Sequence, residues 1–260
     1  MPSPLLLAAL GSSFAAGPGL PPYDDVAALR SRRNYPHLLA LQLGAALVDL
    51  TVSGATTASI LHTPQVTMDG TTFAPQLAGL PAGTDVVTVT AGGNDLQFLG
   101  SMLSASWRRH DPGHPMVAVL EQQLGAGVAE PTPSSLAAAA EGLVQVVEAA
   151  RRAAPAARVV LVDYLTVVDE ASADAAPFDL DDLATFLRIQ SALETAFDQA
   201  ASRTGAELVR ASTLSRGHAL GSAEPFVFGF ETAPARIPAS FHPNARGMEA
   251  VARRVATLLS

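Results

Sequence analysis

The chain reads Leu5-Leu6-Leu7-Ala8-Ala9-Leu10-Gly11-Ser12-Ser13-Phe14 near its start, an apolar run that stops at a Gly-Ser-Ser turn. Such a run is typical of a buried strand, and the small residues after it indicate a tight turn into a helix or loop. The hydroxyls of Ser12 and Ser13 then stand at the carboxyl end of a strand. Ligands of open parallel α/β sheets bind at this edge, because strand-to-helix loops and helix amino termini gather there.

Two other interpretations of this stretch compete with a catalytic one. Ser12 or Ser13 could simply cap the next helix, since serine is favoured at helix N-caps. The stretch could also be a secretory signal peptide. However, it lacks a basic segment, and cleavage after Ala15 or Ala16 would remove the first strand. We therefore treat it as part of the folded domain, and the choice between a cap and a nucleophile depends on the rest of the chain.

The composition limits the class of protein. With 260 residues, 48% hydrophobic and 15% charged, the chain fits a single large α/β domain over residues 1–260. The net charge is −8 and lysine is absent, so no basic stripe is available for nucleic acid. No apolar run approaches the roughly 20 residues that cross a bilayer, so we expect a soluble protein without stable membrane insertion.

Cysteine is absent, which excludes disulfides, thiolate catalysis and cysteine-ligated metal sites. The absence leaves the compartment open, because both a secreted and a cytoplasmic protein fit it. His110 and His114 flank Asp111 and suggest a metal site, but Pro112 and Gly113 break the helix that would align the two histidines. We expect no metal there.

Further secondary structure follows from local patterns. Apolar, β-branched segments predict strands at residues 47–53, 85–91, 157–164 and 205–211. Helical spacing predicts helices at residues 35–44, 97–109, 116–124, 133–152 and 179–203, and a last one ending at 259. We expect Ser134 to cap the helix that begins at 133, and Pro243 to fit the first turn of the last helix.

Two of these strands end in residues that suit catalysis. Gly54 follows the strand at 47–53, where it either permits a tight bend or points its N–H at the serine. Asn94 follows Gly92 and Gly93 after the strand at 85–91. Its side chain could donate to a developing oxyanion while the glycines allow close approach. The alternative is an Asn-Asp turn that caps a helix.

The carboxyl-terminal part supplies a candidate base. A long irregular section at residues 212–241 is expected to border the site, and its Phe226, Phe228 and Phe230 either line an acyl-binding surface or pack in the core. His242 follows this section, and a histidine at the mouth of the sheet can accept the serine proton.

Four blocks together resemble the SGNH hydrolases, also called the GDSL esterase and lipase family: Gly11-Ser12-Ser13-Phe14, Ser53-Gly54-Ala55-Thr56, Gly92-Gly93-Asn94-Asp95 and His242-Pro243-Asn244. The resemblance covers nearly the whole chain. It implies a three-layer, flavodoxin-like α/β/α fold with a five-stranded parallel sheet, and ester hydrolysis through an acyl-serine intermediate. By the same resemblance Ser13 is the nucleophile, His242 is the base, and the oxyanion is held by Ser13, Gly54 and Asn94. No metal or organic cofactor is implied.

Two positions depart from the family pattern. Ser12 stands where the family has aspartate, and Ala239 stands where the family has the acid that orients the histidine. A backbone carbonyl of Ala239 or Ser240 could orient His242 and leave a Ser-His dyad; Glu224 or Glu231 could also reach in.

We therefore expect a serine carboxylester hydrolase that acts on a small-molecule ester or lipid and is a monomer. The alternatives are a non-catalytic ligand-binding module on the same scaffold, or an acyltransferase.

Overall fold

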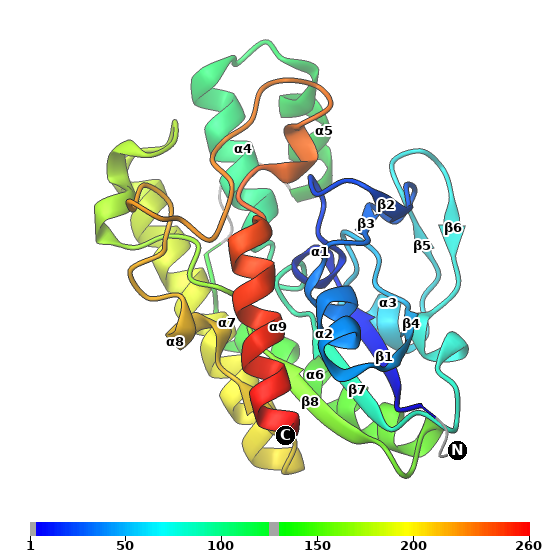
Figure 1. The fold of residues 1–260 in the computed structure, drawn as a ribbon. Helices are drawn as coiled ribbons and strands as arrows, with labels where there is room; N and C mark the ends of the chain where they lie inside the picture. The colour runs from blue at the N-terminus through cyan, green and yellow to red at the C-terminus, as the bar shows by residue number, and fades with distance from the viewer. Residues whose placement is uncertain (1–3, 125–129) are drawn as a thin grey trace.

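Five parallel strands form the central sheet of the structure, a computed structural model that describes residues 4–124 and 130–260. The sheet order is β4-β1-β7-β8-β9, and Figure 1 labels the first four of these strands. The strands are β1 (Leu6–Gly11), β4 (Ala46–Asp49), β7 (Val86–Thr90), β8 (Arg158–Val162) and β9 (Glu207–Val209). Two short antiparallel ribbons lie outside it: β2 (Tyr23–Asp25) with β3 (Arg30–Ser31), and β5 (Gln65–Val66) with β6 (Thr72–Phe73).

Helices cover both faces of this sheet. On one face α2 and α9 contact each other; on the other α6 packs against α7 and α3 (Figure 1). The α-helices are α1 (Ser13–Ala16), α2 (Tyr35–Leu43), α3 (Thr57–Leu61), α4 (Phe98–His110), α5 (Pro115–Leu124), α6 (Pro133–Ala153), α7 (Leu180–Thr204), α8 (Ala211–Leu214) and α9 (Ala245–Leu259). Three 3₁₀ segments are η1 (Gln76–Gly79), η2 (Glu170–Asp174) and η3 (Ile237–Ala239). The expected three-layer α/β fold is confirmed.

The core explains why the strands were recognisable from sequence. Every residue of β1 from Leu7 to Leu10 is fully buried, as are Val87 and Val89 of β7. A parallel sheet covered on both faces is apolar along its whole length, which produces continuous runs rather than alternation. In α6, by contrast, Leu143, Val147 and Ala150 recur at helical spacing on its buried side.

The register of β1 and β7 brings two predicted site turns together. Gly11 pairs with Thr90, so both strands end at the same level. A Cβ added at Gly11 would lie 2.5 Å from the Thr90 carbonyl oxygen, which excludes any larger residue there. The turns that carry Ser13 and Asn94 therefore leave the sheet side by side.

The strand predicted at 47–53 was wrong in its length, since β4 ends at Asp49. The Asp49 carboxylate accepts hydrogen bonds from the N–H (3.0 Å) and the hydroxyl (2.6 Å) of Thr51, a local turn that ends the regular strand. The Val52 N–H nevertheless donates to the Gly11 carbonyl at 3.1 Å. The chain therefore still follows β1 and carries Gly54 to the carboxyl edge of the sheet.

Two helix starts also differ from the prediction. Thr132, not Ser134, caps α6, and Ser135 completes a reciprocal capping box. Pro243 lies outside α9, because Asn244 is the N-cap and its side chain accepts from the Gly247 N–H at 3.1 Å. An asparagine oxygen satisfies an otherwise unpaired helix N–H, whereas proline only fits the first turn, so the cap sets the start.

No helix within residues 4–124 and 130–260 has the length and apolar character needed to cross a membrane.

Candidate active site

The nucleophile turn connects β1 to the short helix α1. Ser12 is the N-cap residue of α1, yet its side chain makes no capping hydrogen bond. The Ser12 hydroxyl instead lies 2.8 Å from the hydroxyl of Tyr164. The idea that Ser12 serves as a side-chain cap was therefore wrong.

Ser13 is the first residue of α1 and is 5% exposed. Its hydroxyl has no hydrogen-bond partner among the described residues. A serine on a tight turn with an uncommitted hydroxyl retains the freedom that a nucleophile needs.

His242 lies on the loop between η3 and α9 and is 7% exposed. Its ring is 5.8 Å from the ring of Phe14, the neighbour of Ser13, so the two ends of the chain meet here. Burial lowers the pKa of His242 to about 4, against the opposing effect of the Ser240 and Pro238 backbone. The imidazole is therefore neutral near pH 7, which is the form that accepts a proton.

Among the described residues, no carboxylate pairs with His242. The Nδ1 atom of His242 is buried and has no hydrogen-bond partner of good geometry among the described residues. The imidazole ring also makes no hydrogen bond to Ser13 there. Ala239 is fully buried, and a Cβ added at Gly19 would overlap its side chain. Position 239 thus provides neither a carboxylate nor room for one.

The two loop glutamates considered from sequence are bound elsewhere. Glu231 accepts a hydrogen bond from Arg236 at 2.7 Å, and Glu224 accepts one from Arg246 at 3.2 Å. Neither glutamate contacts His242 in this structure. Each carboxylate thus has a guanidinium partner.

Gly54 and Asn94 lie on the turns to either side of Ser13, because β1 stands between β4 and β7 in the sheet. Gly54 has φ +84°, a backbone conformation that favours glycine. The Asn94 side-chain amide donates to the Ala55 carbonyl at 2.8 Å and so ties these two turns together. An amide has two donors, so one N–H of Asn94 remains available for a ligand.

The residue after Asn94 has a structural task. Asp95 accepts hydrogen bonds from the N–H (3.1 Å) and hydroxyl (2.5 Å) of Thr57, the first residue of α3. Burial raises the pKa of Asp95, and the bonds from Thr57 oppose that rise. The alternative of an Asn-Asp cap on the following helix was wrong, because the N-cap of α4 is Gln97, and its side chain makes no capping hydrogen bond. Asp95 instead holds the start of α3.

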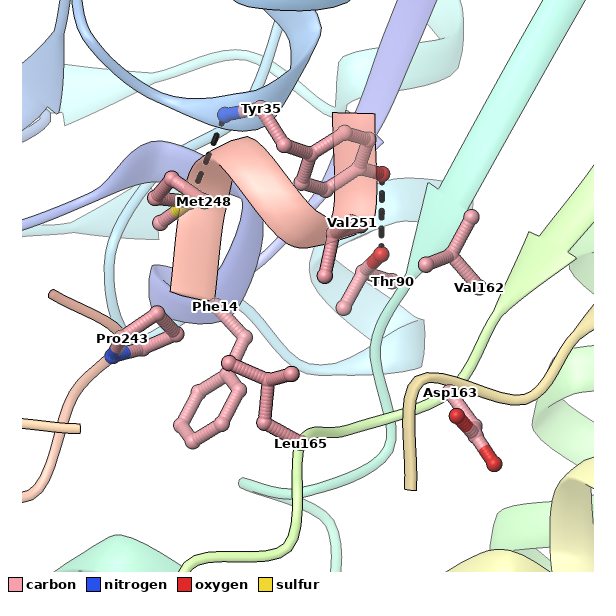
Figure 2. Close-up of a pocket in the computed structure, with 9 residues that line it drawn as sticks. All are labelled: Phe14, Tyr35, Thr90, Val162, Asp163, Leu165, Pro243, Met248 and Val251. Atoms are coloured by element: carbon pink, nitrogen blue, oxygen red, sulfur yellow. Dashed lines mark hydrogen bonds between the residues drawn. The ribbon is translucent and has the colours of Figure 1, made fainter. Parts of the chain in front are cut away.

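A small cavity of about 10 Å³ lies beneath the nucleophile turn (Figure 2). Figure 2 shows Phe14 and Pro243 on one side of it, and the Tyr35–Thr90 hydrogen bond and Asp163 around the rest. A volume of this size holds one water at most, so this cavity is not the substrate pocket.

Sequence reasoning missed Asp163 and Tyr164, the first two residues after β8. Asp163 accepts from the N–H (2.9 Å) and hydroxyl (2.7 Å) of Ser212, and burial raises its pKa to about 7. Tyr164 bonds to Ser12 and accepts from the Gly93 N–H at 3.1 Å. Their only signal in the sequence was their place at the end of a predicted strand.

The remaining candidates pack against neighbours. His114 stacks on Trp107 with ring centroids 4.0 Å apart, and His110 meets the same ring edge-on at 5.8 Å. Phe226 stacks on His218 at 3.9 Å. Across the described ranges, no three His, Asp or Glu side chains gather as metal ligands would.

The chain is similar to known proteins over nearly its whole length. Residues 9–250 match the model of the GDSL-like lipase/acylhydrolase family. Lipase 2 of Streptomyces coelicolor is 32% identical, with 96% of this chain and 84% of that protein covered. The lipase of Streptomyces rimosus is 27% identical, with 92% and 81% covered. Among solved structures, phospholipase A1 from Streptomyces albidoflavus superposes with a TM-score of 0.73 at 20% identity, covering 99% of each chain.

Proposed function

Because the chain belongs to the GDSL-like lipase/acylhydrolase family of ester hydrolases, we propose that it hydrolyses a small ester or lipid through an acyl-serine intermediate on Ser13. One observation carries this proposal. Strands β1 and β7 end at the same level, and the chain after β4 continues alongside β1, so that Gly54, Ser13 and Asn94 follow three adjacent strands at one edge. The ring of His242 packs on Phe14, the neighbour of Ser13.

In the proposed reaction, the Ser13 oxygen attacks the ester carbonyl while His242 Nε2 accepts the hydroxyl proton. The tetrahedral oxyanion is held by the N–H groups of Ser13 and Gly54 and by the free N–H of Asn94. His242 then returns the proton to the leaving alcohol. Water attacks the acyl-serine with His242 again as base, and this releases the acid and restores Ser13.

A backbone carbonyl replaces the family's acid in this proposal. The Ala239 carbonyl already accepts the backbone N–H of His242 at 3.0 Å, so Ser240 is the better candidate to orient the ring. The Ser240 backbone also has the largest effect opposing the lowered pKa of His242. A carbonyl fixes the tautomer by accepting the Nδ1 proton, and it adds no buried charge.

A lipid or short-chain acyl ester is the substrate class that we favour. The relatives from Streptomyces coelicolor and Streptomyces rimosus are named as lipases. The partly buried Phe228 adds an apolar side chain close to Gly19, on the loop that faces Ala239. A chain-length series of p-nitrophenyl esters, with Ser13→Ala as the blank, measures this preference.

Covalent labelling tests the proposed nucleophile. A fluorophosphonate should label Ser13 stoichiometrically, and Ser13→Ala should abolish cleavage of p-nitrophenyl acetate and butyrate. Full activity in Ser13→Ala would refute the acyl-serine mechanism.

A second candidate, a non-catalytic ligand-binding module, is favoured by one observation, the unpartnered Nδ1 of His242. It predicts a folded protein that the fluorophosphonate does not label.

A further inference from the structure

Tyr164 connects two turns that the proposed reaction uses. It is the second residue after β8 and is 4% exposed. Its hydroxyl lies 2.8 Å from the Ser12 hydroxyl and accepts the Gly93 N–H at 3.1 Å. Burial raises the pKa of Tyr164 further above its ordinary value, so the phenol keeps its proton and can donate one hydrogen bond while it accepts another.

Ser12 holds the backbone that presents Ser13. Its N–H donates to the Thr90 carbonyl at 2.9 Å, and its own carbonyl accepts from Ala15 and Ala16 in α1. Ser12 is fully buried, and Tyr164 is the partner of its hydroxyl. The side chain of an N-cap serine ordinarily accepts a hydrogen bond from its own helix, but the Ser12 hydroxyl bonds instead to Tyr164, which lies after β8.

Gly93 holds the backbone that presents Asn94. A Cβ added at Gly93 would lie 2.6 Å from a carbon of the Tyr164 ring and 2.8 Å from its hydroxyl. Gly93 does not have a positive φ, so the ring contact is what requires glycine here. The tyrosine therefore contacts the residue before Ser13 and the residue before Asn94.

The ring of Tyr164 also supports the histidine side of the site. Its centroid lies 4.3 Å from that of Phe14, which in turn packs on His242 at 5.8 Å. One buried side chain thus contacts the nucleophile turn by its hydroxyl and by its ring, and the asparagine turn by its hydroxyl.

We propose that Tyr164 is a positioning residue that fixes the nucleophile turn relative to the asparagine turn, an inference that rests on the proposed function. Stabilising the oxyanion requires the Ser13 oxygen and the Asn94 N–H at a set separation, and errors near 1 Å cost about 10²-fold in rate. Binding of the ground-state ester depends less on that separation than stabilisation of the oxyanion does, because the oxyanion forms only in the transition state.

Tyr164→Phe removes only the hydroxyl. We expect kcat to fall about 10- to 100-fold with KM changed less than about twofold, the pattern of an interaction needed in the transition state. The matched control is Tyr35→Phe, since Tyr35 is equally buried and its hydroxyl bonds to Thr90 at 2.9 Å. We expect the control to keep kcat within about threefold; equal kcat in the two variants overturns the proposal.

A double-mutant cycle separates positioning from general loss of stability. Ser12→Ala keeps the tyrosine ring and removes the hydroxyl partner, so it also decides the question if Tyr164→Phe does not fold. Its kcat should fall in the same direction, and the double variant should fall less than the product of the two single losses, because both remove one shared bond. Wild-type kcat in Ser12→Ala, or independent losses, contradicts the proposal.

Ser13→Ala completes the set and keeps the two proposals apart. If Ser13→Ala is inactive and Tyr164→Phe matches Tyr35→Phe, only the role of Tyr164 is wrong. If Ser13→Ala is active, the nucleophile and its positioning residue are refuted together.

Discussion

The buried imidazole of His242 should keep the enzyme active in acid. A proton acceptor works only in its neutral form, so the acid limb of kcat/KM reports the pKa of the free enzyme's base. Burial lowers the pKa of His242 from 6.5 to about 4. We therefore expect the acid limb near pH 4 rather than near the ordinary histidine value.

The size of the effect follows from this shift. At pH 5.5 more than about nine-tenths of a histidine with the lowered pKa is neutral, against about one-tenth with an ordinary one. The same shift costs stability in acid, because the unfolded chain binds the proton more readily than the folded one. Well above pH 6.5 the histidine is neutral in both states and stability is not reduced. As the pH falls from 6.5 toward 4, the folded state loses about 3 kcal/mol of stability relative to the unfolded chain.

The assay is kcat/KM for p-nitrophenyl butyrate between pH 4 and 8, read where p-nitrophenol and its anion absorb equally. Circular dichroism at each pH identifies the range in which the protein stays folded. A histidine of ordinary pKa would lose about fivefold in kcat/KM between pH 6.5 and 5.5, and a fall of that size with the fold intact would refute the low pKa of His242.

Three further predictions concern single residues. Burial raises the pKa of Asp163 to about 7, so its own contribution to stability should fall by up to about 4 kcal/mol as the pH rises from 4 to 7, opposite in sign to that of His242. In urea unfolding, the difference in stability between Asp163→Asn and wild type should change by this amount over that range, and a difference that does not change with pH contradicts it. Ala239→Asp introduces the family's acid into a fully buried position against Gly19. We expect at least about 2 kcal/mol of destabilisation and no gain in kcat, because the buried carboxylate is poorly accommodated. A variant with higher kcat and unchanged stability would show that position 239 has room for a carboxylate. Asn94→Ala should lower kcat about 10²–10³-fold with little change in KM, and a loss confined to KM would remove Asn94 from the oxyanion hole.

The buried strands could be predicted from the sequence, because burial on both faces produces continuous apolar runs. The apolar runs of β1, β7 and β8 were recognisable because a sheet covered on both faces excludes polar residues along its length. The same parallel order then implies that Gly11 and Thr90 end together, which brings two predicted turns to one edge.

Features that depend on single side-chain contacts were not predictable. The end of β4 is set by the bonds between Asp49 and Thr51, which compete with the ladder. The bond between Ser12 and Tyr164 joins residues 152 positions apart, and nothing local in either segment indicates it. The raised pKa of Asp163 arises from tertiary burial, which a strand pattern does not quantify.

The central claim is that Ser13 and His242 share a proton above the sheet. A crystal structure of the fluorophosphonate adduct tests it most directly. We predict phosphorus bonded to the Ser13 oxygen, the phosphoryl oxygen about 3 Å from the Gly54 and Asn94 nitrogens, and His242 Nε2 within about 3.2 Å of the Ser13 oxygen. An adduct on another residue, or a His242 ring turned away from Ser13 in the adduct, would contradict the account.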